Sequence, residues 1–141
     1  MKIKAVLTGL FVMGAALTAK ANYDITFQTF DPADFTQHLV LDVGGAPVTG
    51  PSFLGQLYVG ANAGSLAAIG NPVAFSPSGS GGEGFIADAT ISVTDATLNA
   101  GSPAVYALRA WNASAGASFE AASLVVGAHV GSSSVTPITL G

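Results

Sequence analysis

Residues 104–121, AVYALRAWNASAGASFEA, decide the fold of this chain. Residues 104–112 have the period-two pattern of a β-strand, and the small residues that follow predict a turn. The stretch contains the only tryptophan, Trp111, and Arg109 lies two positions earlier, on the same face of the strand. Because a strand this apolar must bury at least one face, either the Trp111 face or the Tyr106 face is core.

Arg109 needs a partner if the Trp111 face is buried, because an isolated buried charge is very costly. Glu120 follows after the turn at Gly116, which would bring it back toward the strand. We therefore expect a structural ion pair between Arg109 and Glu120, with another carboxylate as the alternative partner. Residues 118–122 fit one helical turn with Ser118 as its N-cap.

Short segments with strand patterns occur along the rest of the chain, separated by clusters of Gly, Pro and Asn. They are residues 22–30, 38–43, 52–59, 65–69, 72–75, 85–93, 124–130 and 134–140. Residues 76–84 have the composition of a flexible loop, and Pro137 marks the last strand as an edge strand. We predict an all-β domain, an antiparallel β-sandwich of Ig-like or jelly-roll-like type with about seven to nine short strands. A parallel β-solenoid is the alternative, but no sustained repeat supports it.

Residues 1–21 have the features of a signal peptide. Two lysines precede the apolar run 5–17, and residues 19–21, Ala-Lys-Ala, match a small-x-small cleavage motif. The run is shorter than the roughly 20 residues that a membrane-spanning helix needs. We predict cleavage after Ala21 and export of one domain, residues 22–141, with no membrane span after cleavage. A buried helix or a retained anchor is the alternative.

The charge composition makes several partners improbable. The chain has four Lys and Arg residues and eight Asp and Glu residues, and three of the four cations lie in the leader. The exported domain therefore keeps one cation, Arg109. Because phosphate binding needs several Lys or Arg residues, we expect neither nucleic acid nor anionic membrane surfaces as partners. The chain has no cysteine, so it has neither a disulfide nor a cysteine-based zinc site.

No group of residues has the spacing of a metal site, and we predict no metal ligands and no cofactor. His38 and His129 lack a recognisable third ligand. Asp31, Asp34 and Asp42 lack the density of acidic residues that is typical of a calcium loop. Turn capping by these carboxylates is favoured, and a weak calcium site is left open.

Catalytic patterns are equally weak, and we predict no catalytic residues. Glu83 and Glu120 could serve as the acid and base of a glycosidase only at a fixed separation across a sugar site. Residues 78–82, SGSGG, lack the lysine and helix that follow in a phosphate-binding P-loop. The chain has no G-x-S-x-G nucleophile elbow. An enzyme is therefore the least favoured class.

Aromatic side chains are the feature that most favours a ligand. Trp111, Tyr58 and Tyr106, together with Phe119, could stack on sugar rings if they were exposed. A carbohydrate-binding module, with extracellular polysaccharide as its partner, is therefore the alternative function.

Four segments in order resemble secreted bacterial β-modules of the type associated with PEP-CTERM sorting and exosortase. They are residues 52–60, 65–75, 108–121 and 131–133. The most specific part is the R-A-W-N strand followed by the G-A-S-F-E-A turn. The chain ends without the Pro-Glu-Pro motif, apolar helix and arginine cluster of that family, so it would be a freely secreted or truncated member. The resemblance implies a secreted or cell-surface β-sandwich, in a family that is mostly of unknown function. From the leader, the missing catalytic pattern and the Ser-, Gly- and Ala-rich composition with one cation, we predict a non-enzymatic structural or adhesive protein of the cell surface or extracellular matrix. Extracellular polysaccharide and other surface proteins are its candidate partners.

Overall fold

The computed structural model describes residues 23–27, 30–31, 36–37, 39–86, 89–93, 98–99 and 101–140, and this part of the chain is mostly β-strand. The predicted leader, residues 1–21, lies outside it. The strands are β1 Tyr23–Phe27, β2 Phe30–Asp31, β3 Thr36–Gln37, β4 Phe53–Gly60, β5 Ala67–Ala74, β6 Ala89–Val93, β7 Pro103–Asn112, β8 Val130–Ser132 and β9 Thr136–Thr139. The short helical elements are α2, Phe119–Ser123, and the 3₁₀ turns Gly50–Ser52, Ala63–Ser65 and Ala113–Ala115.

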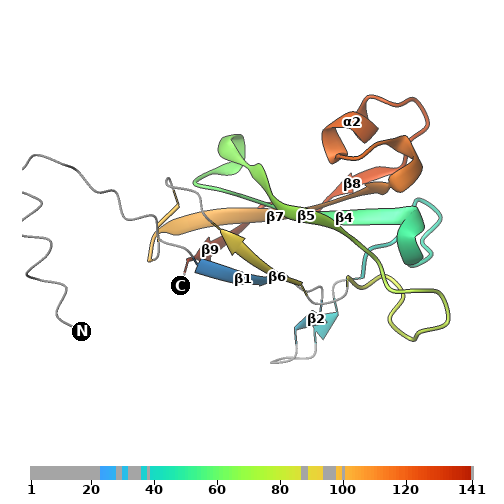
Figure 1. The fold of residues 1–141 in the computed structure, drawn as a ribbon, viewed down its shortest axis with the longest axis horizontal. Coiled ribbons are helices and arrows are strands. Elements are labelled where there is room, and N and C mark those ends of the chain that lie inside the picture. The colour runs from blue at the N-terminus through green and yellow to red at the C-terminus, as the bar shows by residue number, and fades with distance from the viewer. Residues whose placement is uncertain are drawn as a thin grey trace, which may run out of the picture.

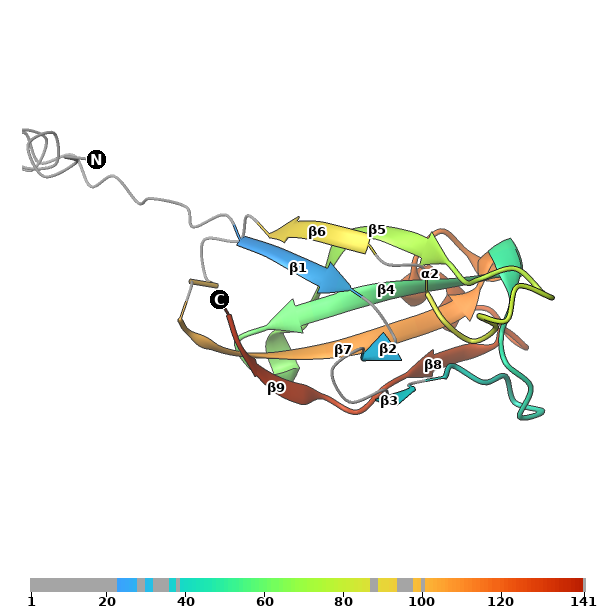
Figure 2. The same cartoon turned by 90° about the horizontal axis from the view of Figure 1, so that it is seen from below.

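The main sheet is antiparallel, with β4 and β7 at its centre (Figure 1). β4 pairs with β5 along one edge and with β7 along the other. β8 and β9 pair with different parts of the free edge of β7, which is the longest strand described (Figure 2). The strands β1 and β6 form a separate pair, as do β2 and β3. The predicted all-β class is therefore confirmed, with most of the strand residues in one antiparallel sheet and little helix.

Both faces of the central strands are covered, where the sequence required only one. Leu57 and Val59 of β4 face the main hydrophobic core, which also contains Ile91 of β6. Tyr58 and Trp111 face the other way and are buried on the side where α2 lies. Figure 1 shows α2 on one side of the sheet and the paired strands β1 and β6 on the other. Because α2 covers one face and the main hydrophobic core the other, β4 and β7 are apolar on both faces.

The helical turn predicted after the Trp111 strand is present as α2. The Ser118 hydroxyl accepts a hydrogen bond from the Ala121 N–H at 3.2 Å, which is the predicted N-cap contact. Ala122 is completely buried against the sheet side of the helix. The strand and the turn of the deciding stretch were both predicted within about one residue.

The predicted strand 124–130 is wrong. After α2 the chain continues in turns, with the Val125 N–H donating to the Ala122 carbonyl at 3.0 Å. Gly127 then adopts a φ of +82°, which redirects the backbone. Of this segment, only Val130 enters a strand, β8. The Leu and Val side chains that suggested a strand here are largely exposed to solvent.

The predicted strand 38–43 is also wrong over its described part, residues 39–43. Only a single bridge forms, between Leu41 and Pro47. The Asp42 carboxylate accepts hydrogen bonds from the N–H groups of Gly44, at 2.8 Å, and Ala46, at 3.0 Å. These bonds close a turn, because an aspartate that binds the backbone ahead of it bends the chain.

Two predicted segments, residues 65–69 and 72–75, form one strand, β5. Between the pairs Leu57–Ile69 and Gly55–Val73 the register shifts, so that three residues of β5 lie opposite Gln56 alone. This is a β-bulge rather than a break. The Gln56 amide donates to the Gly70 carbonyl at 2.8 Å and so pins the bulge.

Candidate functional site

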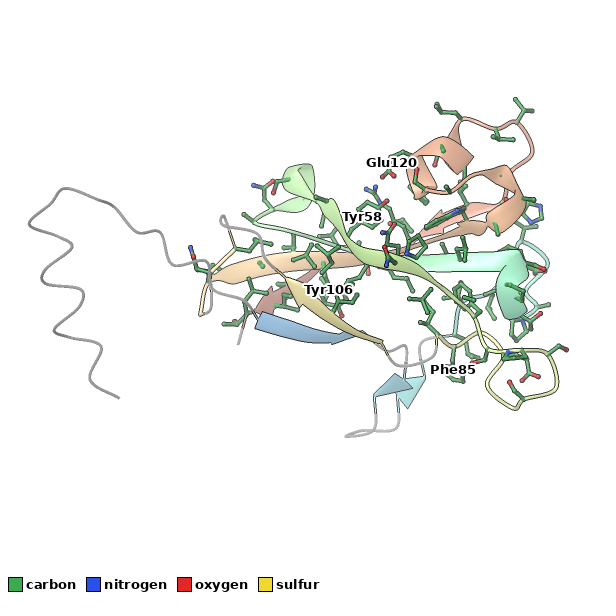
Figure 3. The ribbon with its side chains drawn as sticks, in the orientation of Figure 1. Tyr58, Phe85, Tyr106 and Glu120 are labelled. Carbon is green, nitrogen blue, oxygen red and sulfur yellow. The ribbon has the colours of Figure 1, made fainter. Side chains whose placement is uncertain are left out.

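The charged residues of the deciding stretch meet a tyrosine from the neighbouring strand. Arg109 of β7 and Tyr58 of β4 lie on the same face of the sheet, because the register pairs Arg109 with Gln56 and Tyr58 with Ala107. Glu120, in the first turn of α2, lies above Tyr58 (Figure 3), and its carboxylate contacts both Tyr58 and Arg109. We call Arg109, Tyr58, Glu120 and Phe119 the α2 anchor.

Two donors of the α2 anchor bind the Glu120 carboxylate. The Tyr58 hydroxyl donates to its two oxygens at 2.8 and 3.0 Å. Arg109 Nη1 donates to Glu120 Oε1 at 3.1 Å, so the ion pair predicted from the sequence is present. The Arg109 side chain is 25% exposed and that of Glu120 60%, so the pair lies at the rim of the covered face.

Aromatic rings complete the environment of the guanidinium group. The Arg109 Cζ atom lies 4.2 Å from the centre of the Tyr58 ring and 4.9 Å from that of Phe119. Such cation–π contacts contribute about 0.5–2 kcal/mol, depending on exposure. The buried Nε atom of Arg109 makes no hydrogen bond. Rings and carboxylate thus hold the guanidinium group in place.

The protonation states of the α2 anchor suit a structural contact. Burial raises the pKa of Tyr58, and so do its hydrogen bond with Glu120 and the negative charge of Glu120. Together they bring this pKa to about 12. Burial works to raise the pKa of Glu120, but hydrogen bonds from its own N–H and from Tyr58, and the charge of Arg109, hold that pKa below its usual value. At neutral pH the tyrosine is therefore a donor and the glutamate an ionised acceptor. A general base needs a pKa near the working pH, and neither group is shifted in that direction.

Three of the four aromatic residues considered for sugar stacking do not share a platform. Trp111 is 0% exposed, and its Nε1 donates to the Gly116 carbonyl at 2.9 Å. The Tyr58 ring is almost completely buried under Arg109. Tyr106 lies on the opposite face of the sheet, against the main core. Neither Trp111 nor Tyr58 presents an open ring face on which a sugar could stack.

The histidines and aspartates considered for metal binding are placed apart or lie outside the described side chains. The His129 ring stacks on Phe53 with 6.5 Å between ring centres. The Asp42 carboxylate accepts hydrogen bonds from backbone N–H groups of its own turn. His38 and the side chains of Asp31 and Asp34 lie outside the described part. Within that part, the side chains of His, Asp and Glu form no group of three that could hold a metal ion.

The glycine-rich loop, residues 76–84, carries an internal anion. The Glu83 carboxylate accepts a hydrogen bond from the Gly79 N–H. The N–H groups of Glu83 and Gly79, followed by those of Gly81 and Ser80, lower the pKa of Glu83, while burial acts in the opposite direction. The loop lies on the side of the sheet away from α2 (Figure 1), so Glu83 and Glu120 do not flank a common sugar site. Backbone N–H groups that would suit a phosphate face the chain's own carboxylate instead.

Sequence reasoning missed the role of Tyr58 and Phe119 as partners of the Arg109–Glu120 pair. Phe119 lies edge-on to Tyr58 and to Trp111, with 6.4 Å between ring centres in both cases. Tyr58 is distant in sequence and reaches the pair only through the register of β4 and β7. The adjacency of Phe119 to Glu120 was the one local signal available.

Comparisons with protein-family models, curated proteins and solved structures found no match for this chain. Within the described residues, no helix has the length and apolarity required to cross a membrane.

Proposed function

We propose that this chain is a non-enzymatic structural or adhesive protein, secreted or held at the cell surface. The use of Arg109 and Glu120 carries the proposal. Both are charged groups of a kind that enzymes use. Here they bind one another, Tyr58 contacts both, and Arg109 also lies over the Phe119 ring, so that the four side chains hold a helix on a sheet. Arg109 and Glu120, the side chains that most resemble catalytic residues, therefore support a structural role.

Export is proposed from the leader pattern of residues 1–21. We expect the exported form to begin at Asn22, and the intact mass of protein recovered from the medium or cell surface tests this. A mass that includes residues 1–21 would contradict cleavage at this position.

The finer architecture is proposed as a β-sandwich whose second layer includes β1 and β6. Support comes from Ile91 of β6, which lies in the same core as Leu57 and Val59 of β4. In a sandwich, both layers share one core and unfold together. Substitution of Ile91 by Ala should therefore speed hydrogen exchange in both β4 and β6, and an effect confined to β6 would contradict the shared core.

The structural role is tested by removing the gene in the producing cell and restoring it with a tagged copy. We expect the tagged protein in the surface or matrix fraction, and weaker aggregation or attachment of cells that lack it. Retention of the tagged protein in the cytoplasm would contradict the proposal.

A pull-down with the producer's polysaccharide tests the alternative. Binding that is lost in Trp111→Ala, while the far-UV circular dichroism is kept, would replace the structural role by carbohydrate recognition. The burial of Trp111 and Tyr58 weighs against that outcome.

A further inference from the structure

Residues 113–128, which we call the cap, cover the α2 side of the sheet. The cap contains α2, and Trp111 holds it from beneath through the hydrogen bond from its Nε1 to the Gly116 carbonyl. Ala122 of α2 is completely buried. Phe119 packs edge-on against both Trp111 and Tyr58. These contacts all belong to the first half of the cap.

The second half of the cap buries little apolar surface. Leu124 is 86% exposed and Val126 is 101% exposed, with Val125 about half exposed between them. Gly127, at a φ of +82°, ends this half. A segment with few buried apolar contacts opens more readily than the sheet beneath it.

Glu120 is the one acidic residue of the cap, and its carboxylate is the only ionised group by which the cap holds the sheet. α2 packs against β7, β8 and the turn Ala113–Ala115. From β7 the charged group that faces Glu120 is Arg109, and from β4 the titratable group is Tyr58. The turn and β8, Val130–Ser132, contain no titratable residue.

We propose that the cap is an acid-released strap and that the Glu120 contact with Tyr58 and Arg109 is its latch. Protonation of Glu120 removes its attraction for Arg109 and leaves one weaker acceptor for the Tyr58 hydroxyl. The guanidinium group, whose Nε already lacks a hydrogen-bond partner, then loses its counter-charge. Opening uncovers Trp111 and Tyr58 while the sheet and the main core stay folded.

The pKa of Glu120 decides whether the cap opens in acid or in base. Its pKa in the folded protein lies below the ordinary glutamate value of 4.5. The contact therefore contributes fully above the unfolded pKa and is lost as the pH falls through the folded pKa. The strap is closed at neutral pH and opens in acid.

Trp111 is the only tryptophan, so its fluorescence reports on the cap without interference. We would measure acrylamide quenching of Trp111 between pH 8 and pH 3, with far-UV circular dichroism of the sheet at each pH. The quenching constant should rise severalfold in acid before the dichroism changes. Coincident changes in both signals would overturn the proposal, because they would show global unfolding.

Two variants test the latch itself. Glu120→Gln should show raised quenching already at pH 7 and no further rise before global unfolding in acid. Tyr58→Phe removes a donor that lowers the Glu120 pKa, so its quenching transition should move to higher pH. A transition that stays at the wild-type pH in Tyr58→Phe would overturn the proposal even if Glu120→Gln does not fold.

Glu83→Gln is the matched control. Glu83 also has a lowered pKa but lies in the loop 76–84, away from the cap. Its quenching curve should match that of the wild type. If Glu83→Gln raises the quenching of Trp111 at pH 7 as much as Glu120→Gln does, the opening does not depend on the Glu120 contact and the proposal fails.

Discussion

At the scale of single residues, Trp111 joins the sheet to the segment that covers it. It is fully buried and donates to the Gly116 carbonyl. We predict that Trp111→Phe lowers the free energy of unfolding by about 2–4 kcal/mol, because it leaves a cavity and an unpaired carbonyl. Urea unfolding followed by far-UV circular dichroism measures this. Val126→Ala, at a fully exposed position, should change it by less than about 0.5 kcal/mol.

Two glycines in strands give a second residue-scale prediction. A Cβ atom on Gly60 would lie 2.5 Å from the Ser65 carbonyl oxygen, whereas a Cβ atom on Gly131 would meet nothing within 4 Å. Gly60→Ala should therefore cost about 1–3 kcal/mol, because the backbone of the Ala63–Ser65 turn has to move. Gly131→Ala should be neutral or stabilise slightly. Equal melting temperatures for the two variants would show that the turn after β4 can move to make room for a Cβ atom at no cost in stability.

Arg109 and Glu120 were the part of the α2 anchor that could be predicted. The cost of burying Arg109 alone called for a carboxylate, and the turn at Gly116 pointed to Glu120. Tyr58 was not predictable, because its place depends on the pairing of β4 with β7, which a single sequence does not encode locally.

At the scale of elements, β4 and β7 were predicted within about one residue because their runs of apolar and aromatic residues end at clusters of turn residues. Residues 124–130 show the limit of the same argument. Leu and Val favour a strand wherever they occur, but here no neighbouring strand pairs with most of them and Gly127 turns the chain. Pairing, which is a property of the tertiary fold, decided the outcome.

The bulge in β5 leads to a prediction about the edge of the sheet. In the described part of the chain β5 pairs only with β4, and no lysine follows residue 20 to discourage edge-to-edge association. The bulge at residues 70–72, which contains Pro72, takes that role. Deletion of Asn71 and Pro72 leaves Gly70 opposite Gln56 and straightens the strand.

We expect this deletion to raise the apparent mass in size-exclusion chromatography with light scattering, relative to the wild type at the same concentration. Asn71→Ala keeps the bulge and should elute with the wild type. An unchanged mass for a folded deletion variant would show that the bulge does not protect the edge.

At the scale of the whole molecule, the antiparallel all-β class followed from composition and turn spacing, while the arrangement of coverings did not. The sequence required one buried face of β7, and the structure buries both because the segment that contains α2 folds back over Trp111. That return depends on Gly116 and on the contacts of Phe119, which become visible only once β4 supplies Tyr58. The packing of short, irregular segments on a sheet face is therefore the part of the fold that a sequence pattern predicts least well.

The whole molecule should lose stability in acid, because both glutamates with altered titration have lowered pKa values in the folded state. A lowered folded pKa gives stability that is present above the unfolded value and is lost as the pH falls through the folded one. The free energy of unfolding in urea should therefore be flat from pH 8 to about pH 5 and fall between about pH 5 and pH 3. In Glu83→Gln combined with Glu120→Gln, the curve should start lower at pH 7 and fall less steeply. An equally steep fall in the double variant would assign acid sensitivity to the remaining aspartates rather than to the contacts of Glu83 and Glu120.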